Sequence, residues 1–189
     1  MNTETDATTQ LVTPKFSIIR GQSFDVMPIP ILSHNAEWFE AGPVTFAVEA
    51  RLLTKSTDAL SGGGGSIHVF SADRTQEYLR FDCFDRMPHY HYLNHAERRN
   101  VIWGYDPGSN GPMPQWALRA IEERLPSLLR SAGADELATR VEAGGIDVTV
   151  LDRMASAMAV ARERTLRDSG MLDEGIAWFD RWREGLSRN

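Results

Sequence analysis

We expect an α+β fold in which a mainly antiparallel β-sheet of about four to five strands packs against a C-terminal set of three or four helices. Up to Asp106, short runs rich in Val, Ile, Phe and Tyr are broken by turn residues, which favours strands. After Asp106, the apolar residues recur at helical spacing. Because the strands precede the helices instead of alternating with them, the helices should cover one face of the sheet.

The length and composition predict one domain. The chain has 189 residues, of which 42% are hydrophobic, as is ordinary for a soluble domain with one buried core. We expect residues 1–12 to form a disordered tail and residues 13–189 to form the domain. Within that domain, residues 13–105 are the sheet-rich half and residues 106–189 the helical half.

The expected strands are β-branched and aromatic runs, at residues 44–53, 66–71, 77–85 and 88–93, with 16–19 as a further candidate. Residues 27–31 contain two prolines, which lack the N–H that a central strand needs. This segment should therefore be an edge or a connection. Residues 55–65, with four consecutive glycines, should form a flexible hairpin loop.

Turn and cap residues divide the helical half. The first helix should follow Pro114, be kinked or divided by Pro126, and end at Gly133. A short helix should begin at Asp135, and Asp147 should cap a longer one. The apolar face expected for this longer helix is Val148, Leu151, Met154, Ala155 and Met158. A final amphipathic helix is expected from Leu172, Ile176, Phe179, Trp182 and Leu186.

Charge and cysteine content narrow the classes of function. The formal charge of −6 argues against nucleic-acid binding, which needs clustered Lys and Arg. Cys83 is the single cysteine, so it can form neither an intramolecular disulfide nor a cysteine-based zinc site, and it fits a reducing compartment. No run approaches the roughly 18 to 20 apolar residues of a membrane span. We therefore expect a soluble cytoplasmic protein that binds neither nucleic acid nor membrane.

The densest chemical signal is the segment from Asp82 to His95. It holds His89, His91 and His95, three of the five histidines of the chain. Successive side chains of a strand alternate between its two faces, so His89 and His91 should share one face. The tyrosines between and after them should share the other.

A two-residue hairpin loop at residues 86–87 would place Asp82 opposite His91. The polar face would then carry Arg80, Asp82, His89 and His91, and the apolar face Leu79, Phe81, Cys83, Tyr90 and Tyr92. We expect Asp82 and His91 to be neighbours, with Cys83 on the opposite face. A hydrogen bond from His91 to this carboxylate should raise the pKa of His91.

The candidate polar site comprises Arg80, Asp82, His89, His91 and His95. A divalent metal is a possible cofactor, because imidazole and carboxylate bind such ions, and its candidate ligands are Asp82, His89, His91 and His95. In the alternative without metal, these histidines pack among aromatic rings or hydrogen-bond to Asp82.

Two functions follow. The sequence narrowly favours an accessory domain of bacterial type that binds a protein partner or a second copy of itself, because no complete catalytic motif is present. Its expected partner surface is Trp178, Phe179 and Trp182. The alternative is a metal-dependent hydrolase or lyase that uses His89, His91 and a third histidine or carboxylate, with Arg80 binding an anionic substrate.

Overall fold

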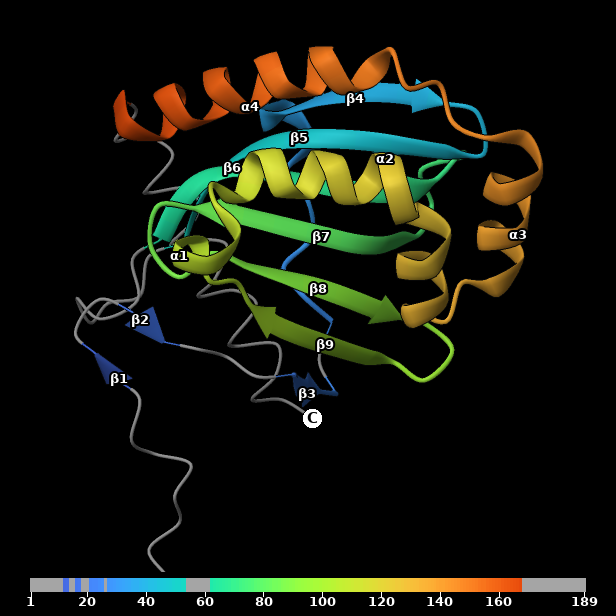
Figure 1. Cartoon of the computed structure of the whole chain (residues 1–189), viewed down its shortest axis with the longest axis horizontal. Coiled ribbons are helices and arrows are strands. Elements are labelled where there is room, and N and C mark those ends of the chain that lie inside the picture. The colour runs from blue at the N-terminus through green and yellow to red at the C-terminus, as the bar shows by residue number, and fades with distance from the viewer. Residues whose placement is uncertain (1–11, 14–15, 18–20, 26, 54–61, 168–189) are drawn as a thin grey trace, which may run out of the picture.

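The computed structural model describes residues 12–13, 16–17, 21–25, 27–53 and 62–167. Seven strands form one antiparallel sheet in the order β3-β9-β8-β7-β6-β5-β4 (Figure 1). The strands are β3 (Gln22–Phe24), β4 (Ala36–Ala41), β5 (Val44–Leu53), β6 (Gly62–Ser71), β7 (Glu77–Phe84), β8 (His89–Asn94) and β9 (Arg99–Gly104). A separate pair is formed by β1 (Val12–Thr13) and β2 (Phe16–Ser17).

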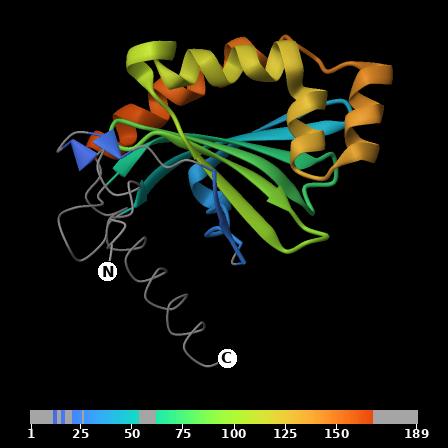
Figure 2. The ribbon, with the colours of Figure 1, turned by 60° about the horizontal axis from the view of Figure 1, so that its bottom comes forward.

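The α+β class is confirmed, with more strands than predicted. Among the described residues the helices are α1 (Pro107–Asn110), α2 (Met113–Ser131), α3 (Asp135–Gly144) and α4 (Val150–Arg167), with a 3-10 helix at Ser33–Asn35. Helices α2 and α4 lie on the same face of the sheet (Figure 2). Helix α4 contacts β4, β5 and β6, α2 contacts β7 and β8, and α3 packs against α2.

The hydrophobic core lies between the sheet and the two long helices. Its most buried large side chains include Phe39, Phe46, Ile67, Leu79, Phe81, Ile121, Leu125, Leu129 and Met154, each less than 2% exposed. Burying such a side chain contributes about 1.5–3 kcal/mol. Because these residues alternate along the strands, the other face of the sheet carries a different set of side chains.

The helix ends follow local sequence signals. Pro126 lies inside α2, and Arg124 has a non-helical φ of −147°, so the proline kinks the helix as expected. Gly133 ends this region with a φ of 74°. The Asp147 carboxylate accepts the N–H of Thr149 before α4, as a capping residue does.

The predicted apolar face of α4 needs a correction. Leu151, Met154 and Met158 are buried, whereas Val148 is 51% exposed and Ala155 is exposed. Ala157 and Ala161 are buried in their place. Since α4 begins only at Val150, Val148 precedes the helix and does not follow its periodicity.

The glycine run was assigned wrongly to a loop, because Gly62–Ser71 is strand β6. A Cβ atom on Gly65 would lie 2.7 Å from Sδ of Met158 in α4, and one on Gly64 would lie 2.7 Å from the Cys83 carbonyl oxygen. Glycine in this strand therefore permits close packing of neighbouring elements instead of flexibility.

A connection crosses the sheet on the face away from the helices. It links β3 and β4, which lie at opposite edges (Figure 1). The Ile29 carbonyl accepts from Arg51 Nη2 at 3.0 Å, and the Leu32 N–H donates to Glu49 Oε1 at 2.8 Å. We call residues 27–32 the strap. Its two prolines fit this role, as predicted, because the strap has no strand partner.

Several predicted features lie outside the described residues. They are the tail up to residue 11, residues 55–61 of the expected loop, the final helix, and the partner surface of Trp178, Phe179 and Trp182. Within the described part of the chain, none of the helices combines the length and the apolar character that crossing a membrane requires.

Candidate metal centre

The β7–β8 hairpin brings the predicted polar residues together, in a register different from the predicted one. Asp82 pairs with His89, and Arg80 pairs with His91. The turn between the strands spans residues 85–88 instead of residues 86–87, and Met87 takes a positive φ of 53°. This shift of two residues leaves every side chain on its predicted face, because the strand period is two.

Asp82, His89 and His91 form a compact cluster of ligand atoms. Nε2 of His89 lies 3.2 Å from Asp82 Oδ2, and Nε2 of His91 lies 3.1 Å from the same oxygen. Asp82 and His91 are buried and His89 is partly buried, with side-chain exposed fractions of 3%, 6% and 14%. Asp82 and His91 are thus neighbours on one face, as expected.

The second nitrogen of each imidazole is held by an oxygen atom. Nδ1 of His89 donates to the Met87 carbonyl at 2.7 Å, and Nδ1 of His91 lies 2.8 Å from Asn100 Oδ1. A carbonyl can only accept, so the proton of a neutral His89 ring must be on Nδ1. Nε2 then presents a lone pair. This arrangement is typical of metal-binding histidines, whose other nitrogen donates to a fixed acceptor.

The spacing of the ligand atoms fits a first-row metal ion. With ligand bonds of about 2.1 Å, adjacent ligands lie about 3.0 Å apart in octahedral and about 3.4 Å apart in tetrahedral geometry. The two nitrogen–oxygen distances in the cluster fall within this interval. In the described part of the chain, Asp82, His89 and His91 are the one group of three or more His, Cys, Asp or Glu residues whose ligand atoms all lie within 4.8 Å of one another.

The electrostatic surroundings of Asp82 favour its ionised form. Burial alone would raise its pKa, but the contacts with His89 and His91 hold the pKa of Asp82 well below its ordinary value. Its other oxygen, Oδ1, accepts from Ser66 Oγ at 2.5 Å. Because Ser66 lies opposite Asp82 on β6, the strand pairing itself orients the carboxylate toward the two histidines.

The pKa values of the two histidines shift in opposite directions. Burial opposes protonation of His89, but Asp82 outweighs it and raises the pKa of His89. For His91 burial prevails and lowers the pKa, which contradicts the rise expected from Asp82 alone. Either ring must be neutral to bind a metal ion, so protons compete with the ion for both histidines.

A second buried polar group lies beside this cluster. His68 on β6 has Nδ1 2.7 Å from Glu77 Oε1 and Nε2 3.2 Å from Glu49 Oε2. Arg80 donates two bonds to Glu77, at 2.7 and 2.6 Å, and Arg51 donates to Glu49 at 2.9 Å. Arg80 is only 1% exposed and donates to Glu77 through two nitrogens, so these contacts do not favour its expected role in binding an anionic substrate, which stays a prediction.

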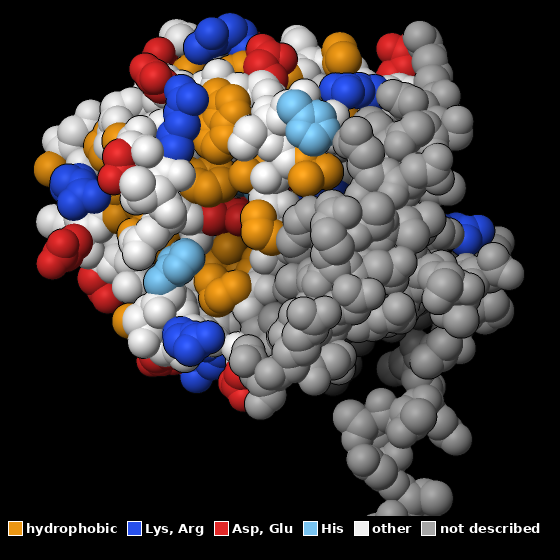
Figure 3. Space-filling model, turned by 180° about the vertical axis from the view of Figure 1, so that it is seen from behind, with side chains coloured by type: hydrophobic (Ala, Val, Ile, Leu, Met, Phe, Trp, Pro, Cys, Tyr) orange, Lys and Arg blue, Asp and Glu red, His pale blue; other side chains and the backbone are white. Residues whose placement is uncertain are grey.

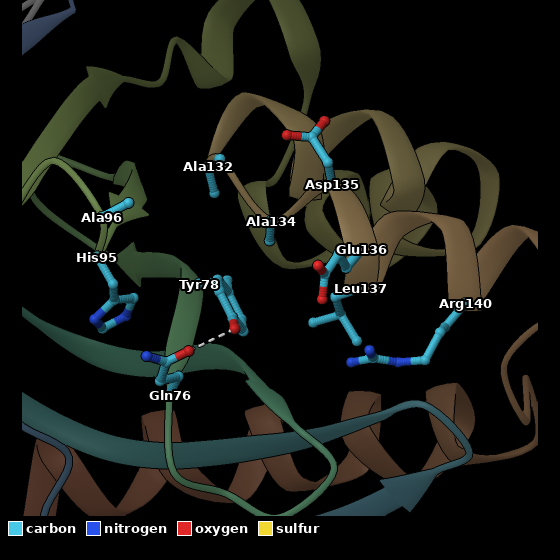
Figure 4. A pocket seen from close by; sticks show the side chains of 11 residues that line it. Gln76, Tyr78, His95, Ala96, Ala132, Ala134, Asp135, Glu136, Leu137 and Arg140 are labelled. Carbon is cyan, nitrogen blue, oxygen red and sulfur yellow. Dashed lines mark hydrogen bonds between the residues drawn. The ribbon is translucent and has the colours of Figure 1, made fainter.

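His95 does not join the metal cluster. It follows the end of β8, and four residues of extended chain place it about 13 Å beyond His91. Its Nε2 donates to the Glu77 carbonyl. The ring lines a pocket of about 600 Å³ between the strand ends and the start of α3, where Tyr78 Oη donates to Gln76 Oε1 at 2.7 Å (Figure 4).

Cys83 lies on the helix-facing side, as predicted, and burial raises the pKa of its thiol well above the ordinary value. Figure 3 shows the molecule from behind, where hydrophobic and histidine side chains are visible at the surface. Around the cluster, the Phe84 ring meets the His89 ring edge-on at 5.7 Å. Ile102 pairs with His91, and Gly104 pairs with His89.

Sequence reasoning missed the residues that orient the cluster. Ser66 and Asn100 come from β6 and β9, and no local motif links either to the histidines. Glu49 is the first residue of the buried ionic group along the chain, and it lies 33 residues before Asp82. A correct pairing of the strands is the signal that would have found them.

The family comparison covers all of these residues. The sequence profile of a family described as "Domain of unknown function (DUF7700)" matches residues 38–158, more than half of the chain. The chain belongs to the DUF7700 family. The DUF7700 region contains β5 to β9, hence every side chain of the cluster and its hydrogen-bond partners. Neither a curated protein nor a solved structure matches the chain.

Proposed function

We propose that the DUF7700 domain is a metal-dependent enzyme, a hydrolase or lyase, whose divalent ion is held by Asp82, His89 and His91. One observation carries this proposal. Three ligand atoms, from the buried Asp82 and His91 and the partly buried His89, converge within 4.8 Å of one another, while Nδ1 of both imidazoles faces an oxygen. The two Nε2 atoms that face Asp82 can therefore bind an ion when they carry no proton.

The composition of the cluster supports a catalytic rather than a structural ion. Structural zinc sites have four protein ligands, whereas catalytic sites have three and leave a position for water or substrate. Two histidines and one carboxylate are a set that catalytic iron and zinc centres use. In the described residues the cluster supplies three ligands, so an ion bound there would keep positions open to a substrate oxygen.

Metal uptake tests the proposal. We expect the purified, untagged chain to bind Co²⁺ or Zn²⁺ with a one-to-one stoichiometry, measured by calorimetry and by metal analysis. The His89→Ala/His91→Ala variant should lose this binding. His95→Ala is the matched control, because His95 lies in the same segment but outside the cluster. The circular dichroism of all three proteins establishes that they are folded.

Near-zero uptake by both the unmodified chain and the double variant would contradict the proposal. Equal loss in His95→Ala would also contradict it, because the ion would then lie elsewhere. The metal-loaded chain is next assayed on carboxylic esters and on β-hydroxy acids, which represent hydrolase and lyase substrates. Turnover should require the ion and should be absent in the double variant.

The partner-binding alternative and a cytoplasmic location stay predictions. The three aromatic residues expected to form the partner surface lie outside the described residues, so no observed contact favours this function. The cytoplasmic location rests on the single buried thiol of Cys83, which fits a reducing compartment. Such a compartment is compatible with a site built from histidine and carboxylate, since neither ligand type is oxidised readily.

A further inference from the structure

The formal charges of the buried ionic side chains on the polar face sum to zero when no metal ion is bound. In the described chain the face carries the carboxylates of Glu49, Glu77 and Asp82 and the guanidiniums of Arg51 and Arg80. Both nitrogens of His68 face a carboxylate oxygen, at 2.7 and 3.2 Å. A neutral ring has only one N–H, so this geometry favours the imidazolium form. Three negative charges thus meet three positive ones.

A divalent ion would leave this buried layer with two excess positive charges. His89 and His91 must be neutral to ligate, so they add nothing. Uncompensated charge is costly in a low-dielectric interior, and an anion that enters with the substrate lowers this cost. The ion therefore favours an anionic ligand at its open positions.

Most N–H donors of the arginines in this layer are already used. Arg80 donates two hydrogen bonds to Glu77, and Arg51 donates to Glu49 and to the Ile29 carbonyl, which leaves Nε of Arg51 as a buried donor without a partner. Phosphate recognition in proteins relies on the two-pronged guanidinium group or on clustered N–H donors. Because neither guanidinium presents two free donors side by side, the bond to the ion itself would hold the anion, and a single carboxylate is sufficient for this.

One side of the cluster is apolar. Phe84 is 4% exposed and contacts the His89 ring edge-on at 5.7 Å. Ile102 lies directly opposite His91 on β9, and directly opposed residues share a face of the sheet. Gly104 lies opposite His89 and contributes no side chain beside this ligand. This side of the cluster therefore suits a hydrocarbon group better than a polar one.

We propose that the metal centre binds the carboxylate of a small, otherwise apolar molecule, with its hydrocarbon part against Phe84 and Ile102, on the side where Gly104 has no side chain. This inference rests on the proposed function and adds the class of substrate to it. The carboxylate supplies negative charge to the ion, and the apolar body is bound by burial.

The test uses the full chain loaded with Co²⁺, whose visible absorption reports changes in coordination. Benzoate is the probe and benzamide its neutral, nearly isosteric control. We expect benzoate to alter the cobalt spectrum and to bind at least about tenfold tighter than benzamide, while the metal-free chain does not bind benzoate. Gly104→Val should keep its cobalt affinity but bind benzoate several-fold more weakly, with a smaller effect on acetate.

Equal affinity for benzoate and benzamide, or no binding of either, would overturn the inference while leaving the metal site intact. Benzoate binding that is unchanged without cobalt would overturn it as well. Tighter binding of phenylphosphonate than of benzoate would show that a dianion, not a carboxylate, is the preferred group. Failure of the chain to take up cobalt would instead overturn the proposed function.

Discussion

Replacing Glu77 with Gln removes one buried negative charge while preserving the size of the side chain. Glu77 accepts hydrogen bonds from Arg80 Nε at 2.7 Å, from Arg80 Nη2 at 2.6 Å and from His68 Nδ1 at 2.7 Å. In Glu77→Gln, an NH₂ group faces these donors, and both cations lose a carboxylate. Breaking a buried ion pair in this way costs about 3–5 kcal/mol, a large share of the roughly 5–15 kcal/mol that stabilises a domain.

Urea unfolding followed by circular dichroism measures this loss. Glu142→Gln is the control, because the Arg130–Glu142 pair has a similar length of 2.6 Å but is about half exposed, and its loss should change stability far less. The double variant Glu77→Leu/Arg80→Met removes both partners. It should be less destabilised than Glu77→Gln, because it leaves no buried guanidinium without its carboxylate, while Glu49 faces His68 in both variants.

The pH dependence provides a second readout of the same group. Burial would raise the pKa of Glu77, but Arg80 and His68 outweigh it and lower the pKa far below the ordinary value of 4.5. A lowered folded pKa stabilises the protein above the unfolded pKa, and this stabilisation is lost as the pH falls below it. The difference between Glu77 and Gln should therefore shrink below about pH 4.5. A Glu77→Gln variant within about 1 kcal/mol of the parent at pH 7 would refute the reasoning.

Three further outcomes are expected. Leu151→Ala should destabilise the domain by about 2–5 kcal/mol in thermal or urea unfolding, whereas Ala155→Ser should have little effect; equal midpoints for both would show that the core face is misassigned. Metal affinity should fall as the pH is lowered from 7.5 to 5.5, because protons compete for His89 and His91, and a pH-independent zinc titration would exclude these ligands. Ser66→Ala should weaken metal binding about 10–100-fold, because the Asp82 carboxylate loses the hydrogen bond that orients it. An unchanged metal affinity would contradict this expectation.

The faces of the sheet were predictable from sequence, but its register was not. Alternation along the strand assigns His89 and His91 to one face and Tyr90 and Tyr92 to the other. A change in turn length that shifts the strand register by an even number of residues leaves this assignment unchanged. The turn after β7 has no glycine at its positive-φ position, which is occupied by Met87. Turn chemistry therefore gave no guide to the register.

The residues that complete the candidate site were beyond local patterns. Residues 99–104 contain Arg, Asn and Gly among their apolar residues, so β9 was not predicted and neither was the role of Asn100. Glu49, His68 and Glu77 come from three strands, and only strand pairing reveals that their charges meet. The ion pair between Arg80 and Glu77 was likewise not predictable, because it depends on the burial of Arg80, which the residue type does not reveal.

The path of the strap has a consequence for the order in which the protein is made. Strand β3 leaves the ribosome early, but its partner β9 follows six strands later. Until then β3 has no edge to join, so the β3 end of the strap is not anchored to the sheet. Hairpins β4–β5, β5–β6 and β6–β7 join consecutive strands and can form as each emerges, because short loops close at little entropic cost. We therefore expect the N-terminal edge to dock last, so that the polar face remains open to solvent, and to an arriving metal ion, throughout synthesis of the sheet.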